Sequence, residues 1–138
     1  MKILLVQPPP PPDWVGFSRT ALPEPLAMEC IGAVAVDHHD VRLIDMRLGD
    51  SLEETLDAFE PDAVAVTCLT TEVYNAQDIL QRVKSRQPQT FTLVGGHHAS
   101  LLPADFQQPY VDAIVVGEGE RTFQELLAAI ERAGGRPD

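Results

Sequence analysis

The chain has 138 residues, of which 44% are hydrophobic and 22% charged, and its formal net charge is -11 at pH 7. This length and composition suit one domain with a single hydrophobic core, and the acidity disfavours binding to nucleic-acid backbones or anionic lipid surfaces. No apolar run approaches the length that spans a bilayer and no signal-peptide pattern opens the chain, so we expect a cytoplasmic protein without membrane insertion.

Five short apolar runs, each followed by a break and an amphipathic segment, predict strands that alternate with helices. The first run ends at Gln7 and five consecutive prolines, which cannot continue a strand ladder and begin a stiff, extended loop. In chain order, the predicted strands are residues 3–6, 41–45, 63–67, 91–94 and 113–116.

The segments between the strands have the apolar spacing of helices. Ser51 and Glu54 fit a capping box at the start of one of them, which Pro61 ends, and Pro88 ends the helix that begins at residue 71. The expected helices cover residues 26–37, begin at 51 and at 71, cover 101–108 and follow residue 120.

Strands that are apolar on both faces and alternate with amphipathic helices predict a parallel sheet covered on both sides. Right-handed crossovers favour a doubly wound, flavodoxin-like (Rossmann-like) α/β fold with five strands in the order 2-1-3-4-5. We expect this one domain to occupy residues 1–133, and residues 134–138 to begin a linker.

The strand at 91–94 runs directly into Gly95 and Gly96, which predict a tight turn at its carboxyl end. Glycines leave the backbone bare, so that another molecule can approach closely, and ligands of open α/β sheets bind at this edge. On this hypothesis Gly96 leaves space for the ligand, and filling that space removes binding without unfolding the protein. A plain strand-to-loop turn is the alternative explanation.

Small and polar residues also follow the other strands at this edge. Besides the prolines after the first strand, the loops are Thr67–Thr71, Gly95–His98 and Gly117–Glu120. Such an edge suits a large ligand rich in hydrogen-bonding groups. No G-x-G-x-x-G or G-x-x-x-x-G-K-[ST] pattern is present, which disfavours dinucleotides and nucleoside triphosphates. Glu118 is expected to begin a helix and is a candidate hydrogen-bond acceptor for the ligand.

Histidines and cysteines give little support to a metal site or a catalytic nucleophile. His97 and His98 are adjacent, so that their side chains should diverge, and the pair at 38–39 precedes the second strand, at the opposite end of the sheet. No carboxylate or thiolate completes a ligand set at useful spacing. Cys30 and Cys68 have apolar neighbours and are expected in the core.

Two motifs resemble those of cobalamin-binding domains. Thr67-x-Leu69 followed by Gly95-Gly96 resembles the S-x-L and G-G motifs, with threonine in place of serine. Almost the whole chain is similar to the N-terminal domain of cobalamin-dependent radical-SAM enzymes. It is most like the anaerobic magnesium-protoporphyrin IX monomethyl ester oxidative cyclases of bacteriochlorophyll synthesis. This wider resemblance rests on the opening strand with its proline loop, Arg42-Leu-Ile-Asp45, Gly95-Gly-x-His98 and Gly117-Glu-Gly-Glu120.

The resemblance implies cobalamin as the cofactor and a C-terminal radical-SAM barrel as the partner. That barrel would carry a [4Fe–4S] cluster and S-adenosylmethionine. Two isolated cysteines cannot hold such a cluster here, so the fragment alone should be inactive. Residues 134–138 would then begin the linker to the barrel. The residues implied in cobalamin binding are Pro9, Pro10, Thr67, Leu69, Thr70, Thr71, Gly95, Gly96, His97, His98, Gly117, Glu118 and Gly119.

One departure from cobalamin domains of the methionine-synthase type leaves alternatives open. In those domains D-x-H-x-x-G follows the first strand and its histidine binds cobalt, whereas prolines stand here. Asp37-x-His39 matches part of the motif, but Arg42 replaces its glycine at the wrong end of the sheet. The domain therefore binds cobalamin without a protein ligand to cobalt, or has lost it. A receiver-like or flavodoxin-like binding domain is the alternative. The loop after strand one, however, lacks the clustered aspartates of a receiver domain and the phosphate-cradling loop of a flavodoxin.

Overall fold

The structure is a computed structural model that describes residues 1–11 and 22–134. All five strands are parallel and lie in the order β2-β1-β3-β4-β5, which confirms the fold and strand order predicted from the sequence. The strands are β1 (Lys2–Gln7), β2 (Asp40–Asp45), β3 (Ala63–Thr67), β4 (Phe91–Gly95) and β5 (Ala113–Ile114).

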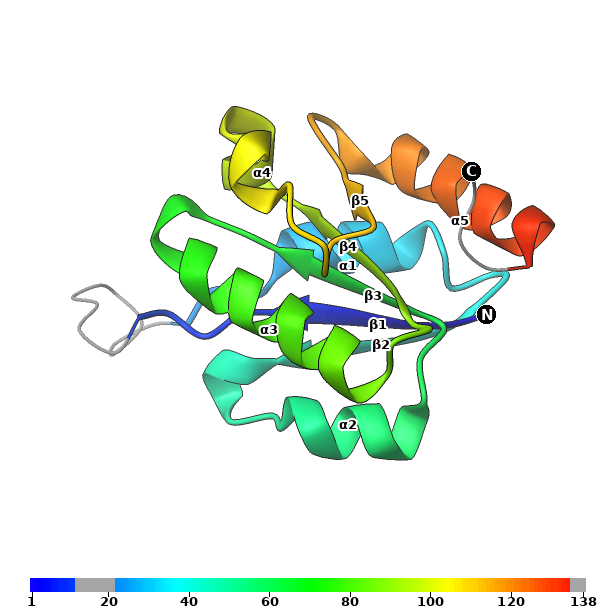
Figure 1. The fold of residues 1–138 in the computed structure, drawn as a ribbon, viewed down its shortest axis with the longest axis horizontal. Coiled ribbons are helices and arrows are strands. Elements are labelled where there is room, and N and C mark those ends of the chain that lie inside the picture. The colour runs from blue at the N-terminus through cyan, green and yellow to red at the C-terminus, as the bar shows by residue number, and fades with distance from the viewer. Residues whose placement is uncertain (12–21, 135–138) are drawn as a thin grey trace.

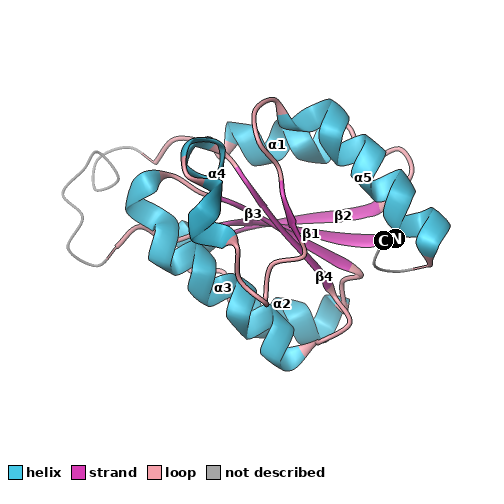
Figure 2. Ribbon diagram, turned by 45° about the horizontal axis from the view of Figure 1, so that its top comes forward, coloured by secondary structure: helices cyan, strands magenta, loops and turns pink. Residues whose placement is uncertain are grey.

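Helices cover both faces of the sheet (Figures 1 and 2). One face carries α1 and α5, and the other carries α2, α3 and α4 with three single 3-10 turns. The doubly wound connections bring the carboxyl ends of all strands to one edge. The elements are α1 (Leu26–Ala33), η2 (Met46–Leu48), α2 (Leu52–Phe59), η3 (Thr70–Glu72), α3 (Val73–Arg86), α4 (His97–Leu101), η4 (Pro103–Phe106) and α5 (Gly119–Ala133).

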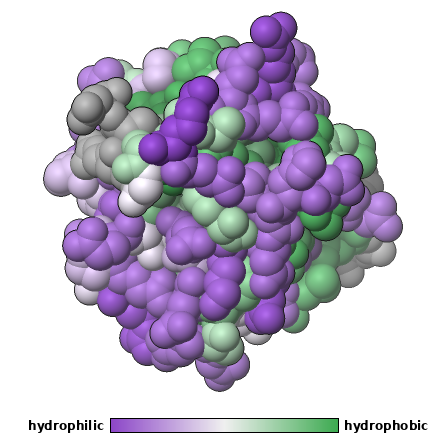
Figure 3. Space-filling view, turned by 90° about the vertical axis from the view of Figure 1, so that its right-hand side faces the viewer, coloured by the Kyte–Doolittle hydropathy of each residue, from purple (hydrophilic) through white to green (hydrophobic). Residues whose placement is uncertain are grey.

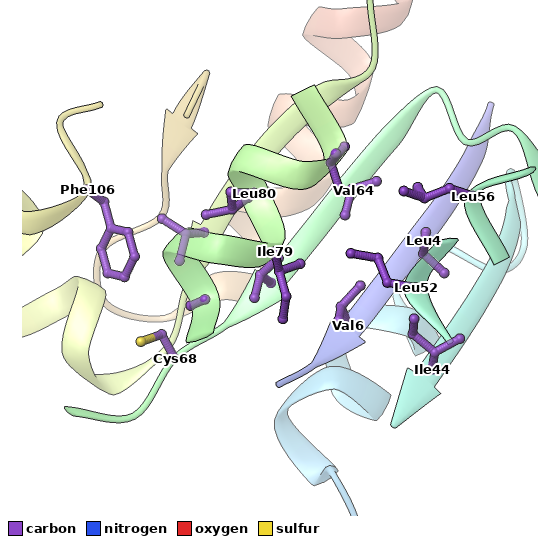
Figure 4. Close-up of a cluster of buried hydrophobic side chains, with 14 of the residues drawn as sticks. Leu4, Val6, Ile44, Leu52, Leu56, Val64, Cys68, Ile79, Leu80 and Phe106 are labelled. Carbon is purple, nitrogen blue, oxygen red and sulfur yellow. The ribbon is translucent and has the colours of Figure 1, made fainter. Parts of the chain in front are cut away.

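The core consists of one apolar layer on each face of the sheet. Leu4 and Val6 of β1 point into the layer beneath α2 and α3, where Figure 4 shows them facing Leu52. The alternate residues Ile3 and Leu5 belong to the layer beneath α1 and α5. These four β1 side chains are fully buried, and each contributes about 1.5–3 kcal/mol to folding. The sheet is therefore buried on both faces, as predicted.

The helix predicted over 101–108 was wrong. Instead, α4 begins at His97, directly after the diglycine, and ends at Leu101. Pro103 then opens the separate turn η4, because proline lacks the N–H that an α-helix interior requires. The consequence is that the residues after β4 sit in a helix close to the sheet edge and not in an extended loop.

Two further boundaries also differ from prediction. Helix α1 ends at Ala33 and not near residue 37, because the chain turns back through hydrogen bonds to the Gly32 carbonyl. Strand β5 has two residues and not four, since it pairs only with β4 and Val116 already faces solvent. Gly134 caps α5 in the left-handed conformation, and the remainder of the predicted linker lies outside the described residues.

The amino edge of the sheet is largely hydrophilic (Figure 3) and holds one buried ion pair. Lys84 Nζ lies 2.5 Å from Asp112 Oδ2, and the Asp112 side chain is 3% exposed. The Thr92 backbone N–H donates to the same carboxylate at 2.9 Å. Burial alone would raise the pKa of Asp112. The hydrogen bond and the positive charge of Lys84, together with the hydrogen bonds from Thr92, outweigh this effect and lower the pKa.

Replacing Asp112 with asparagine is expected to destabilise the protein by about 1–3 kcal/mol at neutral pH. A carboxyl whose pKa is lowered by folding stabilises the protein above its unfolded pKa of about 4, and this contribution disappears as the pH falls through the folded value. The deficit of Asp112→Asn relative to the parent should therefore shrink in acid. Urea unfolding at about pH 7 and pH 3 measures it. Equal deficits at both pH values would contradict the assignment, and Asp37→Asn on the exposed turn before β2 is the control.

Candidate functional site

A pocket of about 200 Å³ opens at the carboxyl edge, on the face of the sheet that carries α1 and α5. Its apolar lining comes from Met28 and Ile31 of α1, Phe123 of α5, and the strand residues Ala65 and Leu93. The strands supply small or branched side chains here, so that space remains between the sheet and the two helices. The pocket can take an apolar or aromatic group from a ligand that lies across the edge.

The structure divides the predicted site residues into two groups. Six of them line this pocket: Thr67, Gly95, Gly96, Gly117, Glu118 and Gly119. The others lie at the same edge, in the chain after β1 and in the connections that follow β3 and β4, outside the pocket lining: Pro9, Pro10, Leu69, Thr70, Thr71, His97 and His98. Glu118 precedes the first turn of α5, as predicted, and its side chain is exposed.

Gly96 is packed against the chain that follows β3. Its φ is +92°, and a Cβ built on it would lie 2.7 Å from Thr67 Oγ1 and 2.9 Å from the Cys68 backbone N. The expectation that its missing side chain leaves space for a ligand is therefore wrong, because the protein's own backbone occupies that space. At Gly95 a Cβ would lie 3.6 Å from Val115 Cβ, and at Gly117 it would meet no atom within 4 Å.

His98 is buried and joins two loops. Its Nε2 lies 2.9 Å from Asp105 Oδ2, its Nδ1 lies 3.2 Å from Thr70 Oγ1, and its ring packs edge-on against Phe106. The backbone N–H of His98 also donates to the Cys68 carbonyl at 2.9 Å. His97 is exposed, so the two histidines diverge as predicted. The resemblance implied His98 in cobalamin binding, but the sequence did not predict these contacts, because its partners are 7 and 28 residues away.

Glu72 is a buried carboxyl that the sequence analysis missed. Its Oε2 accepts from the Leu69 backbone N–H at 3.1 Å, and Gln7 Nε2 lies 3.5 Å from its Oε1. Burial raises the pKa of Glu72. One turn further on, Asn75 Nδ2 donates to the Pro9 carbonyl at 2.7 Å and so fixes the start of the proline loop. The sequence offered no signal for this contact, because leucine at residue 69 does not fit the Ser/Thr-x-x-Glu pattern of a capping box.

Large apolar side chains are exposed at the carboxyl edge. They lie in the connections that follow the strands there, in contrast to the hydrophilic amino edge in Figure 3. Among the described residues, the one exposed large hydrophobic residue that lies elsewhere is Val36, in the turn between α1 and the amino end of β2. The seven at the edge are Leu26, Leu48, Leu69, Tyr74, Leu101, Leu102 and Val116. These seven residues are called the rim below, and exposed apolar side chains at one edge can be covered by a ligand or another domain.

Comparison with protein families decides the kind of domain. The family described as B12 binding domain matches residues 12–127, which include the pocket and both motifs. The chain belongs to the B12-binding domain family. This confirms the resemblance to cobalamin-binding domains.

Relatives of this B12-binding domain are enzymes of greater length. An uncharacterised methyltransferase, PH0819 of Pyrococcus horikoshii, is 33% identical over 96% of this chain and 30% of the relative. The anaerobic magnesium-protoporphyrin IX monomethyl ester cyclase of Rubrivivax gelatinosus is 30% identical over 88% of this chain and 21% of the relative. The cobalamin-dependent radical SAM methyltransferase TokK of Streptomyces tokunonensis is 37% identical over 57% of this chain and 12% of the relative. The chain thus spans 30% or less of the length of these relatives.

Solved structures share the fold of the B12-binding domain. A cobalamin-binding protein from Desulfitobacterium hafniense matches with a TM-score of 0.59 and 10% identity, over 92% of this chain and 57% of that chain. The RcsB response regulator of Salmonella typhimurium matches with a TM-score of 0.62 and 10% identity, over 100% of this chain and 62% of that chain. At this identity both show the fold alone, and it is the family match that separates the B12-binding domain from a receiver domain.

In the described part of the B12-binding domain, no group of three His, Cys, Asp or Glu side chains could hold a metal ion. His39 lies beside the amino terminus, with Nδ1 3.5 Å from the Met1 nitrogen, so Asp37-x-His39 is at the opposite end of the sheet from the pocket. Cys68 is fully buried, as predicted, and burial raises its pKa to about 12; Cys30 is half-buried.

None of the helices in the described residues is both long and apolar enough to cross a membrane.

Proposed function

We propose that this domain binds cobalamin, with the nucleotide tail in the pocket between α1 and α5 and the corrin ring over the carboxyl edge. The pocket is the observation that carries the proposal. Its volume of about 200 Å³ suits one aromatic base and not a whole cofactor, and Met28, Ile31 and Phe123 give it apolar walls. Thr67 and Glu118 at its lining offer hydrogen-bonding groups to the polar parts of a nucleotide.

The partner in this proposal is a catalytic radical-SAM domain that carries a [4Fe–4S] cluster and S-adenosylmethionine. Two observations support it: the relatives are at least three times longer than the matched segment, and the rim of exposed apolar side chains suits burial under a large partner. The cobalamin would supply the cobalt chemistry, while this chain's residues bind and orient it.

Two activities follow from the relatives. Methyl transfer is named for PH0819 and TokK, and we propose it first for the whole enzyme, acting on a lipid or a small metabolite. Oxidative closure of a magnesium porphyrin, an oxidoreductase step of bacteriochlorophyll synthesis, is the second, supported by similarity to the cyclase over 88% of the chain. Product analysis of the full-length enzyme with each substrate class distinguishes them, because one reaction adds a methyl group and the other removes hydrogen.

The direct test is retention of hydroxocobalamin by the 138-residue chain after desalting, measured from the absorbance of the corrin. We expect about one cobalamin per chain. Cobinamide, which has the corrin but no nucleotide tail, should bind roughly tenfold or more weakly, because it leaves the pocket empty. Flavin mononucleotide is the control ligand for the flavodoxin-like alternative. Equilibrium dialysis without retention of cobalamin at high micromolar concentration would refute the proposal for the isolated domain.

A further inference from the structure

Asp105, His98 and Thr70 form a chain of hydrogen bonds that ends at the carboxyl edge. The imidazole is the middle member, with Nε2 at 2.9 Å from Asp105 Oδ2 and Nδ1 at 3.2 Å from Thr70 Oγ1. Its side chain is 4% exposed, whereas Thr70 is exposed on the connection that follows β3. The chain therefore links a buried ring to a hydroxyl group that a bound ligand can reach.

The directions of these hydrogen bonds follow from the chemistry of the three groups. An ionised carboxylate only accepts, so in the neutral form of the imidazole the proton lies on Nε2 and points to Asp105. Nδ1 is then the unprotonated nitrogen and can only accept. The Thr70 hydroxyl must use its one proton to donate to Nδ1, which leaves only oxygen lone pairs for any other partner.

We propose that Asp105 and His98 act as positioning residues that make Thr70 a hydrogen-bond acceptor for N–H groups of the ligand. The inference rests on the proposed function, in which the ligand is cobalamin, and the corresponding donors are the primary amides on the corrin periphery. A hydroxyl free to rotate would accept an amide N–H or donate to a carboxylate equally well. With its proton directed at His98, Thr70 selects amides over acids.

The same contacts give His98 a role that is separate from metal binding. Both ring nitrogens have partners within the protein, at Asp105 and Thr70, and the ring packs against Phe106. His98 therefore reaches the ligand only through Thr70. His97, its exposed neighbour, takes no part in this chain of hydrogen bonds.

The first measurement is the tautomer of His98 in the ¹⁵N-labelled 138-residue chain, by long-range ¹H–¹⁵N correlation at about pH 8. We expect the proton on Nε2 and an unprotonated Nδ1. A proton on Nδ1 would make Thr70 the acceptor of that bond and would overturn the inference. This measurement needs no ligand, so it decides the hydrogen-bond chain even if cobalamin does not bind.

The second measurement is affinity for hydroxocobalamin. Thr70→Val, which keeps the shape but loses the hydroxyl, should bind roughly two- to tenfold more weakly, and Thr70→Ser should bind like the parent. Asp105→Ala should also weaken binding, and the double variant should bind no more weakly than Thr70→Val alone, because Asp105 acts only through Thr70. Asp37→Ala, which removes the same charge at the other end of the sheet, is the control.

A final comparison uses cobalamins in which single side-chain amides have been hydrolysed to acids. The parent should bind one of these isomers distinctly more weakly than the others, and Thr70→Val should lose that discrimination. Additive losses in Thr70→Val and Asp105→Ala, or discrimination that survives in Thr70→Val, would overturn the inference while leaving cobalamin binding intact. If the parent binds no cobalamin at all, the proposed function fails, and with it the ligand assigned to Thr70.

Discussion

Gly96→Ala should destabilise the protein by about 2–4 kcal/mol, and Gly96→Val by more, enough to leave little folded protein if the domain has ordinary stability. Two effects add. The backbone has φ +92°, which is strained for any residue with a Cβ, and that Cβ would lie 2.7 Å from Thr67 Oγ1 and 2.9 Å from the Cys68 nitrogen. The neighbouring atoms include main chain at the end of β3, which cannot move without disturbing the sheet.

The matched control is Gly117→Ala. Gly117 also has a positive φ, +80°, but a Cβ there meets no atom within 4 Å, so only the backbone penalty of about 1 kcal/mol remains. Urea unfolding of the two alanine variants compares them directly. Equal stabilities would show that the contact with Thr67 and Cys68 relaxes freely. The expected difference also means that loss of cobalamin binding by Gly96→Val reports unfolding, and not a filled ligand site.

Ala65→Leu should abolish cobalamin binding, with a loss of roughly a hundredfold or more, and leave the fold intact. Ala65 lies in β3 with its side chain buried against the pocket between α1 and α5. A leucine adds three carbon atoms to a space of about 200 Å³ and competes with the nucleotide tail. Since the added atoms enter an existing cavity, their burial offsets the cost of repacking.

The outcome is read from dialysis against hydroxocobalamin together with a thermal melt of each variant. Ala65→Ser changes chemistry but hardly any volume, and it should retain binding. Cobinamide provides a second control, because a ligand without the nucleotide tail should bind Ala65→Leu and the parent alike. Normal cobalamin affinity in a folded Ala65→Leu protein would place the nucleotide tail elsewhere.

Much of the fold could be predicted because it depends on local patterns. Apolar runs such as 63–67 mark strands buried on both faces, and the handedness of the crossovers limits their order to few possibilities. Boundaries were less certain where one residue changes the outcome. Pro103 interrupts the predicted helix over 101–108, and the edge position of β5 leaves its predicted end without a second partner strand.

The site was predictable in its location but not in its contacts. Parallel strands must bring the Thr67 and Gly95 loops to one edge, so their proximity followed from the topology. The contacts of Gly96 with Cys68 and of His98 with Thr70 join residues 28 apart, and no local pattern encodes which atoms meet. Glycine after a strand therefore looked like space for a ligand, when it is the point where two connections pack.

The contacts at the carboxyl edge also affect the thermodynamics of binding there. The connection after β3 is held to α4 by His98 and is capped by Glu72, while Asn75 holds Pro9 at the start of the loop after β1. These segments lose their conformational entropy when the chain folds, so a molecule that binds across them need not compensate for that loss again. Calorimetry should accordingly show a heat-capacity change set by the apolar area covered, without the larger change that accompanies coupled folding.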